Sequence, residues 1–131
     1  MPDYPETLNG ALRVLVIDDE FLIADYTTDI LEEAGHVVVG TAASAEEALR
    51  VAAQHEIDLA VVDITLKGSM DGIELAHMLR EQGLRHLFIS GSGDPGTLQR
   101  AQATNPLAFL QKPFDSKRLL AVLKNLSSPS G

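Results

Sequence analysis

The chain contains no cysteine, which excludes disulfide bonds, thiolate metal sites and cysteine nucleophiles. Aromatic residues make up only 5% of its 131 residues and tryptophan is absent, so the core must be built from aliphatic side chains. No apolar run approaches the ~20 residues that a membrane-spanning helix needs. Residues 1–6 also lack the basic and apolar regions of a signal peptide. These absences fit a protein of the reducing cytoplasm with no membrane partner.

Basic residues are scarce as well, since ten Lys and Arg stand against nineteen Asp and Glu, for a net charge of −9. Nucleic acids and anionic membranes bind proteins through cationic contacts, so neither is expected as a direct partner. An acidic surface is also a common way for a protein to stay soluble. The length predicts one domain with a core of its own.

Short apolar runs alternate with amphipathic helical patterns, which predicts a parallel sheet with crossover helices. The expected strands are 13–17, 37–40, 57–62, 85–89 and 107–110. Each is followed by an expected helix, and the caps predicted for these helices are Ser44, Asp71, Asp94 and Asp115 at the start and Gly35 and Gly83 at the end. The loop 63–70 follows the third strand.

The helical spacing also predicts which side chains face the core. In the first helix these are Phe21, Leu22, Tyr26, Ile30, Leu31 and Ala34, and in the third they are Ile73, Leu75, Ala76, Met78 and Leu79. The helix 95–103 is the least apolar, with only Leu98, Ala101 and Ala103 available for burial.

Polar residues stand at the ends of four predicted strands: Asp18 and Asp19, Asp63, Ser90, and Lys112. Because the carboxyl ends of parallel strands share one edge of a sheet, these side chains are expected to meet where open α/β sheets bind ligands. Three carboxylates, a hydroxyl and an ammonium describe a site for a divalent cation and a phosphoryl group.

The three carboxylates would repel one another, because two unit charges ~4 Å apart cost ~4 kcal/mol at an effective dielectric near 20. A hard divalent cation offsets this repulsion, and oxygen ligands suit Mg²⁺. Asp63 is a candidate nucleophile, since carboxylates form aspartyl-phosphates, and Lys112 supplies a cation for the phosphoryl oxygens. Taken singly, Asp18 or Asp19 could only cap a helix, Lys112 could be a surface lysine and Ser90 a turn residue.

Five short motifs, in order along residues 12–126, resemble the receiver domain of two-component response regulators. They are Val16-Ile17-Asp18-Asp19-Glu20, Val61-Val62-Asp63-Ile64, Met70-Asp71-Gly72, Ile89-Ser90-Gly91 and Lys112-Pro113-Phe114. The resemblance implies a doubly wound α/β fold of the flavodoxin-like kind, with five helices and a five-stranded parallel sheet of order 2-1-3-4-5.

The resemblance also implies a role for each site residue. Asp63 would be the phospho-acceptor, and Mg²⁺ would be bound by Asp18, Asp19, Asp63 and the backbone carbonyl of Thr65. Lys112 and Ser90 would contact the phosphoryl group, for which Gly91 leaves room. Ser90 and Phe109 would form the switch pair, and the Lys112–Pro113 peptide bond would be cis.

The chain departs from the usual receiver pattern in three places. Lys67 stands near where a proline is usual, and the stretch 63–70 looks one residue longer. The switch aromatic is Phe109 rather than tyrosine. Phe88 with Gly91 and Gly93 is similar to a receiver subgroup, seen mainly in alphaproteobacteria, that has a Gly-rich segment after the fourth strand.

The resemblance implies a histidine kinase or phosphotransfer protein as the phosphoryl donor. It also implies a downstream protein partner on the face made by helix 95–103, strand 107–110 and the last helix. Residues 1–11 are expected to be a disordered lead and 127–131 a flexible tail. A stand-alone regulator or phosphorelay shuttle is favoured over a receiver cut from a longer protein, and a homodimer is left open.

We expect a signalling domain that assists its own phosphorylation and dephosphorylation, not an enzyme. The alternatives are an Mg²⁺-dependent phosphohydrolase with an aspartyl-phosphate, a flavodoxin-like nucleotide or flavin binder, and a docking module that is never phosphorylated. The four histidines have no metal-ligand spacing and are expected at the surface or in loops, none as a phospho-donor: His36, His55, His77 and His86.

Overall fold

The protein is described by a computed structural model that covers residues 11–91 and 94–127. Strands and helices alternate as β1 (Arg13–Ile17), α2 (Phe21–Glu33), β2 (Val37–Ala42), α3 (Ala45–Gln54), β3 (Leu59–Asp63), α4 (Gly72–Glu81), β4 (Arg85–Ser90), α5 (Pro95–Gln102), β5 (Phe109–Gln111) and α6 (Ser116–Ser127). Most of the predicted lead (1–10) and most of the predicted tail (128–131) lie outside the described residues. Ser92 and Gly93 of the Gly-rich segment also lie outside them.

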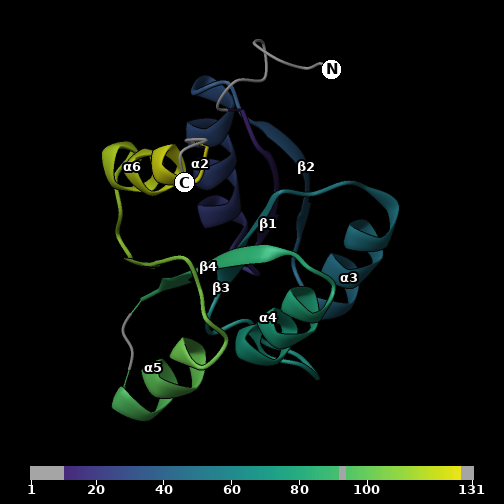
Figure 1. Ribbon diagram of the computed structural model, residues 1–131. Helices are drawn as coiled ribbons and strands as arrows, with labels where there is room; N and C mark the ends of the chain where they lie inside the picture. Colours follow the sequence, from purple (N-terminus) through teal and green to yellow (C-terminus); the bar gives the residue numbers. More distant parts are fainter. Residues whose placement is uncertain (1–10, 92–93, 128–131) are drawn as a thin grey trace.

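The five strands form one parallel sheet in the order β2-β1-β3-β4-β5, as the resemblance implied (Figure 1). Ile17 pairs with Val62, and Asp63 pairs with Ile89, so the carboxyl ends of the central strands stand level. The sequence order reverses between β1 and β3, which is the position where doubly wound sheets open a crevice for ligands.

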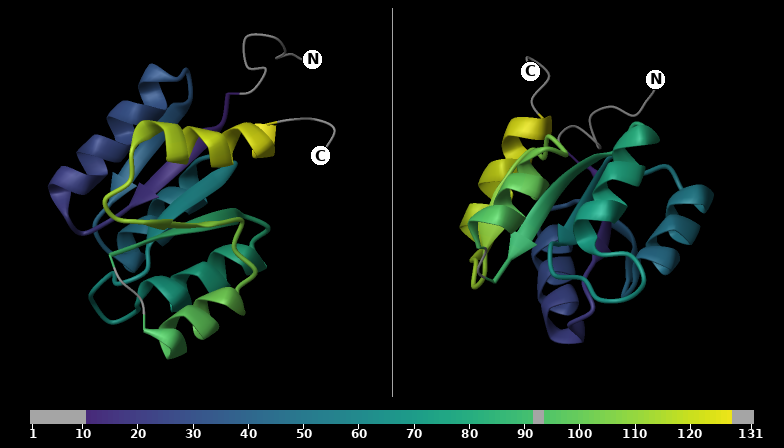
Figure 2. Two further views of the ribbon diagram at one scale, coloured as in Figure 1. Left: turned by 90° about the vertical axis from the view of Figure 1, so that its left-hand side faces the viewer. Right: turned by 90° about the horizontal axis from the view of Figure 1, so that it is seen from below.

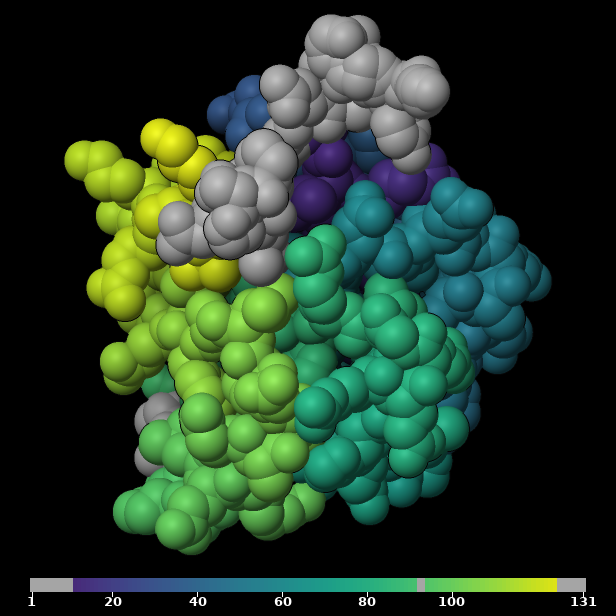
Figure 3. Space-filling view, viewed as in Figure 1, coloured from purple at the N-terminus to yellow at the C-terminus, as the bar shows by residue number. Residues whose placement is uncertain are grey.

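Helices cover both faces of the sheet (Figure 2). On one face, α3, α4 and α5 pack over side chains that include Leu15, Val62 and Phe88. On the other, α2 and α6 pack over Val16 and Ile89. In the space-filling view α4 and α5 form one continuous surface (Figure 3). Within the described residues, no helix has the length and apolar character to cross a membrane.

The predicted caps are confirmed. Ser44 accepts a hydrogen bond from the N–H of Glu47, Asp94 from that of Thr97, and Asp115 from that of Arg118. Asp71 and Glu74 form a reciprocal capping box at the start of α4. Gly35 and Gly83 follow α2 and α4 with φ of 94° and 84°, the left-handed conformation that glycine adopts without steric cost.

Some predicted bounds were wrong. Strand β2 continues to Ala42 because it pairs with β1 along its whole length. Strand β5 begins at Phe109 rather than at residue 107; the N–H of Leu107 donates to the carbonyl oxygen of His86, near the start of β4, and Leu107 is 40% exposed. Strand β3 begins two residues later than predicted, at Leu59, and includes Asp63.

Several residues predicted to face the core are exposed instead. Phe21 and Leu22 form the start of α2, just after the loop that follows β1, and are 74% and 77% exposed. Tyr26, Ala34, Met78, Leu98 and Ala103 are also exposed. The buried face of α2 is made by Ala24, Thr27, Ile30 and Leu31. Helix α5 is indeed sparsely buried, since Ala101 is its single buried residue.

The prediction that the histidines lie at the surface or in loops was wrong for His86 and right for His36, which lies in the loop between α2 and β2. His86 lies inside β4 and is only 2% exposed. His36 is half-buried, and its Nδ1 accepts a hydrogen bond from the backbone of Leu12 at 2.9 Å. His55 and His77 are exposed, as expected.

Candidate functional site

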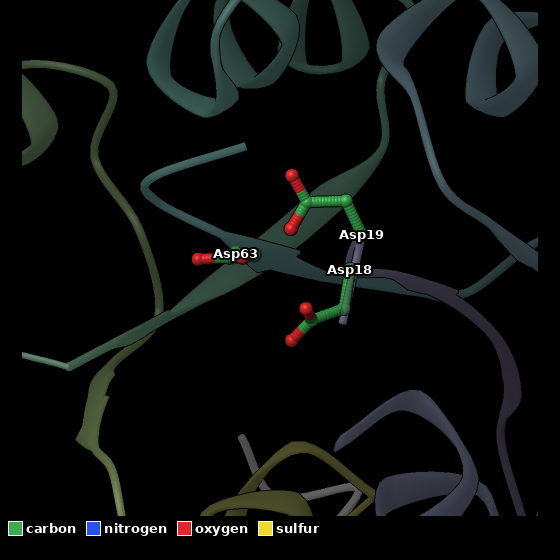
Figure 4. Close-up of side chains that lie close together, drawn as sticks. All are labelled: Asp18, Asp19 and Asp63. Atoms are coloured by element: carbon green, nitrogen blue, oxygen red, sulfur yellow. The ribbon is translucent and has the colours of Figure 1, made fainter. Parts of the chain in front are cut away.

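Three carboxylates meet at the carboxyl edge of the sheet. Asp18 and Asp19 follow β1, Asp63 ends β3, and one carboxylate oxygen from each lies within 4.8 Å of the others (Figure 4). Asp18 and Asp63 are buried, at 5% and 1% exposure, whereas Asp19 is partly exposed. The parallel register of β1 and β3 brings these residues together, as the strand ends predicted.

Asp18 and Asp19 are not merely helix caps. Helix α2 has Glu20 at its N-cap position, with no side-chain capping bond. Asp18 Oδ1 accepts from the N–H of Glu20 at 2.8 Å, and its Oδ2 has no hydrogen-bond partner within residues 11–91 and 94–127. Burial raises the pKa of Asp18 to about 6, against the lowering effect of the Glu20 N–H, while Asp63 raises this pKa and Lys112 lowers it.

The loop after Asp63 contributes backbone groups to the acidic cluster. The N–H of Lys67 donates to Asp19 Oδ2 at 3.3 Å. A proline at that position could not make this contact, because it has no N–H. The departure from the usual pattern at Lys67 therefore coincides with an additional hydrogen bond to the cluster.

The two oxygens of Asp63 have different surroundings. Oδ1 accepts hydrogen bonds from both the N–H and the hydroxyl of Thr65, at 3.0 and 2.9 Å. Oδ2 is buried and has no hydrogen-bond partner in the part of the chain that the structure describes. The N–H and the hydroxyl of Thr65 thus both donate to the acceptor side chain, and the role implied for its carbonyl stays a prediction.

Gly72, in the first turn of α4, packs directly on the end of β3. A Cβ at this position would lie 2.2 Å from the carbonyl oxygen of Asp63, far inside normal contact. Only glycine fits here, which gives a physical reason for the glycine of the Met70-Asp71-Gly72 motif. The resemblance to receiver domains included this motif but implied no role for Gly72.

Lys112 reaches the cluster from the end of β5. Its Nζ lies 3.5 Å from Asp18 Oδ2, 3.8 Å from Asp63 Oδ2 and 3.7 Å from Glu20 Oε1. The lysine side chain is only 14% exposed, so it is not an ordinary surface lysine. The contact with Glu20 was not predicted, although Glu20 belongs to a recognised motif.

The segment after Lys112 is held against α2. The Lys112–Pro113 peptide bond is cis, as the resemblance implied. The hydroxyl of Tyr26 donates to the carbonyl oxygen of Phe114 at 2.8 Å, and their rings pack with centroids 5.6 Å apart. Tyr26 was predicted only as a core residue, and helical spacing alone gives no signal for this contact.

Ser90 ends β4 beside the acidic cluster, and its buried hydroxyl oxygen has no hydrogen-bond partner among the described residues. An unsatisfied buried hydroxyl costs about 1–3 kcal/mol, so this group is available for a ligand. A cavity of about 530 Å³ adjoins it, lined by Ser90, Leu98, Gln102, Phe109, Leu110, Gln111 and Arg118. Phe109 is half-buried there, and Gly91 has no atom within 4 Å of the position of a Cβ.

The residues of the cluster fit a magnesium ion. Buried oxygens of Asp18 and Asp63 lack hydrogen-bond partners among the residues described, and the more exposed carboxylate of Asp19 stands beside them. Mg²⁺ prefers such oxygen ligands and retains some of its water molecules, which the exposed side of the cluster allows.

Comparison with known proteins agrees with this geometry. The family model described as the response regulator receiver domain matches residues 14–124. The heme response regulator HssR of Staphylococcus haemolyticus is 33% identical over 110 residues, which are 83% of this chain and 48% of that protein. The chain thus spans about half the length of the curated relatives it matches.

Two solved structures illustrate the likeness in three dimensions. The receiver domain of a modulated diguanylate cyclase from Desulfovibrio desulfuricans has a TM-score of 0.84 and 34% identity, covering 92% of this chain and 99% of that one. CheY of Borrelia burgdorferi, in a complex with CheX, BeF₃ and Mg²⁺, has a TM-score of 0.80 and 26% identity over 89% and 90% of the two chains. The protein therefore belongs to the receiver-domain family of two-component response regulators.

Proposed function

We propose that this receiver domain accepts a phosphoryl group on Asp63 from a histidine kinase or a phosphotransfer protein. The observation that carries the proposal is the environment of Asp63 Oδ2. This oxygen is buried, free of hydrogen bonds among the described residues and 3.8 Å from the ammonium of Lys112. Its lone pairs are available for attack, while Thr65 holds the other oxygen of the same carboxylate in place.

The transfer itself needs only one bond made and one broken. Asp63 Oδ2 attacks the phosphorus of a phosphohistidine, the P–N bond breaks, and its electron pair returns to the imidazole of the donor. Such reactions depend on positioning and on neutralising charge. Lys112 would shift from its carboxylate partners toward the phosphoryl oxygens, and the unpaired hydroxyl of Ser90 would donate to one of them.

Magnesium would be held by Asp18, Asp19, Asp63 and the carbonyl of Thr65. When bound, it would offset the charge of the carboxylates and of the incoming phosphoryl group. The BeF₃ and Mg²⁺ of the Borrelia complex, at a TM-score of 0.80, support this assignment.

Phosphorylation would then alter the partner face formed by α5, β5 and α6. The new group adds roughly −1.5 to −2 charge next to Ser90. Ser90 would be drawn toward it, and Phe109 would turn into the adjoining cavity, with Gly91 leaving room for the phosphoryl oxygens. To change the ratio of switched to resting conformation from 1:99 to 99:1, phosphorylation and the partner together must stabilise the switched conformation by ~5.5 kcal/mol relative to the resting one.

The donor protein must cover the rim of the site to reach Asp63. Phe21 and Leu22 are large, exposed apolar side chains on that rim, three and four residues after Asp18. We assign them to the donor-binding surface. The same proposal places the protein in the cytoplasm, limits the receiver unit to residues 12–126 and includes self-catalysed dephosphorylation. Whether the protein forms a homodimer stays open.

Intact mass measurement after incubation with acetyl phosphate and Mg²⁺ tests the acceptor. We expect one added phosphoryl group, absent in Asp63→Asn and in the presence of EDTA. Asp25→Asn, an exposed carboxylate on α2, is the matched control and should be labelled like the wild type. Labelling of Asp63→Asn at full stoichiometry would show that the acceptor is another residue.

A wild-type protein that gains no mass from acetyl phosphate would be tested next with a phosphorylated phosphotransfer domain. Failure with this donor as well would refute the proposal and favour a docking module that is never phosphorylated.

A further inference from the structure

Helix α5 is attached to the rest of the molecule mainly at its C-terminal end. Ala101 and, just past the helix, Thr104 are both fully buried, whereas Leu98 is 38% exposed. One further link is the ion pair of Arg100 with Asp71, at 3.5 Å and with both side chains largely exposed, which contributes little. The attachment therefore depends on what holds Ala101 and Thr104.

A chain of two hydrogen bonds joins this end of α5 to the interior of β4. The hydroxyl of Thr104 donates to the carbonyl oxygen of Ala101 at 2.7 Å, which uses its single hydrogen. The Nε2 of His86 lies 2.8 Å from the same hydroxyl oxygen, so Nε2 must be the donor. Burial lowers the pKa of His86 to about 4, with smaller contributions from Arg80 and His77, so the imidazole is neutral with its proton on Nε2.

His86 also begins a row of side chains that leads to the phosphorylation site. Alternate residues of a strand share one face, so His86, Phe88 and Ser90 all lie on the side of β4 that α5 covers. The rings of His86 and Phe88 pack edge to face, with their centroids 5.1 Å apart. Phe88 also stacks on Phe109 of β5, with ring centroids 5.8 Å apart. The row thus runs from the buried anchor at one end to the unpaired hydroxyl of Ser90 at the other.

We propose that His86 is a positioning residue, which anchors the C-terminal end of α5 through Thr104 so that α5 pivots about this end when Asp63 is phosphorylated. The pivot, unlike the anchor, rests on the function proposed above. The N-terminal end of α5, at Pro95, is close to Ser90 in the sequence, so a movement of Ser90 would reach this end first. The other end stays fixed because a buried histidine and a buried threonine hold it.

Amide hydrogen exchange of the unphosphorylated protein tests the anchor. The N–H groups of Ala103, Thr104 and Asn105 bond within the last turn of α5 and report its opening. Thr104→Val keeps the shape but leaves the His86 donor unpaired, and we expect about tenfold faster exchange of these three amides. Thr104→Ser keeps the hydroxyl and should stay within about threefold of wild type.

His86→Phe is the second test, because it keeps a ring against Phe88 and leaves no donor unpaired. It should also speed exchange at residues 103–105, and less than Thr104→Val does. The anchor would be refuted if the amides of residues 103–105 exchanged at the same rate in Thr104→Val and Thr104→Ser. It would also be refuted if neither Thr104→Val nor His86→Phe exchanged faster than wild type. The hydrophobic contacts of Ala101 would then be sufficient to hold the helix.

Addition of beryllofluoride and Mg²⁺ tests the pivot. In the wild type, the amide signal of Leu98 should shift more than that of Thr104, and in Thr104→Val the shift should spread to residues 103–105. A shift at Thr104 equal to that at Leu98 would refute the pivot. No shift anywhere would refute the proposed switching and the pivot with it, while the exchange experiment still decides whether His86 is an anchor.

Discussion

Replacement of Gly72 by alanine tests how closely α4 packs on the strand that carries the acceptor. The added Cβ would lie 2.2 Å from the carbonyl oxygen of Asp63 and 3.1 Å from the Cα of Ile64. Even close carbon–oxygen contacts are roughly 3.3 Å long, so α4 and the end of β3 would have to separate by about 1 Å. A displacement of that size moves Asp63 relative to Lys112 and the other carboxylates.

Both the size and the sign of the effect follow from this contact. Overpacking in a rigid site costs about 1–3 kcal/mol. For a chain of this size, each kcal/mol lowers Tm by roughly 3–6 °C, so we expect a Tm about 3–18 °C below wild type. Helix propensity alone predicts the opposite sign, because alanine stabilises a helix by roughly 0.5–1 kcal/mol relative to glycine.

Thermal unfolding and acetyl phosphate labelling, measured on the same samples, check this prediction. Gly96→Ala is the matched control: it lies in the first turn of α5, and its nearest atom is Asp94 Oδ1 at 3.5 Å. This control should be as stable as wild type or slightly more so, and labelled at the same rate. If Gly72→Ala matched the control in Tm and labelling, the close packing of α4 on Asp63 would be refuted.

Three further predictions concern pH, the unpaired hydroxyl and the metal. Because the pKa of His86 is lowered from 6.5 to about 4, the unfolded chain binds a proton that the folded chain does not, and stability should fall by about 3 kcal/mol as pH drops from 6.5 to 4. The raised pKa of Asp18 makes the folded protein more stable as pH drops from 6 to 3.8, which opposes the effect of His86. The free energy of unfolding in urea is therefore compared between wild type and His86→Phe at each pH, with EDTA present. Identical pH profiles of the two proteins would contradict the prediction. Ser90→Ala should stabilise the resting protein by about 1 kcal/mol while weakening its response to beryllofluoride, and a loss of stability in urea would show that the hydroxyl is satisfied. Mg²⁺ should raise Tm in a concentration-dependent way that Asp19→Asn weakens, whereas an equal rise in the variant would place the ion elsewhere.

Local patterns were sufficient to predict most of the fold. The caps at Asp71 and Asp94 were identified correctly because a side chain and an amide three residues later form them, and both are visible in the sequence. Asp18, Asp63 and Lys112 were brought together correctly because parallel strands place their carboxyl ends at one edge. The strand order came from the resemblance to receiver domains, since no local pattern specifies it.

Features that depend on distant contacts were not predictable in the same way. Phe21 and Leu22 follow the helical spacing, but whether a first turn is covered depends on where the sheet ends. His86 has a polar side chain, and its burial depends on Thr104, a residue eighteen positions away. The close approach of Gly72 to Asp63 likewise requires α4 to fold back over β3.

The bond from Tyr26 to the carbonyl of Phe114 has a consequence for protein engineering. It ties α2 to the segment that carries Lys112, so α2 and this segment form a fixed frame for the reactive groups. The opposite side of the sheet presents α5, whose outward residues touch none of the three carboxylates. New partner specificity could therefore be selected by varying the exposed positions of α5 alone, with the chemistry at Asp63 left intact.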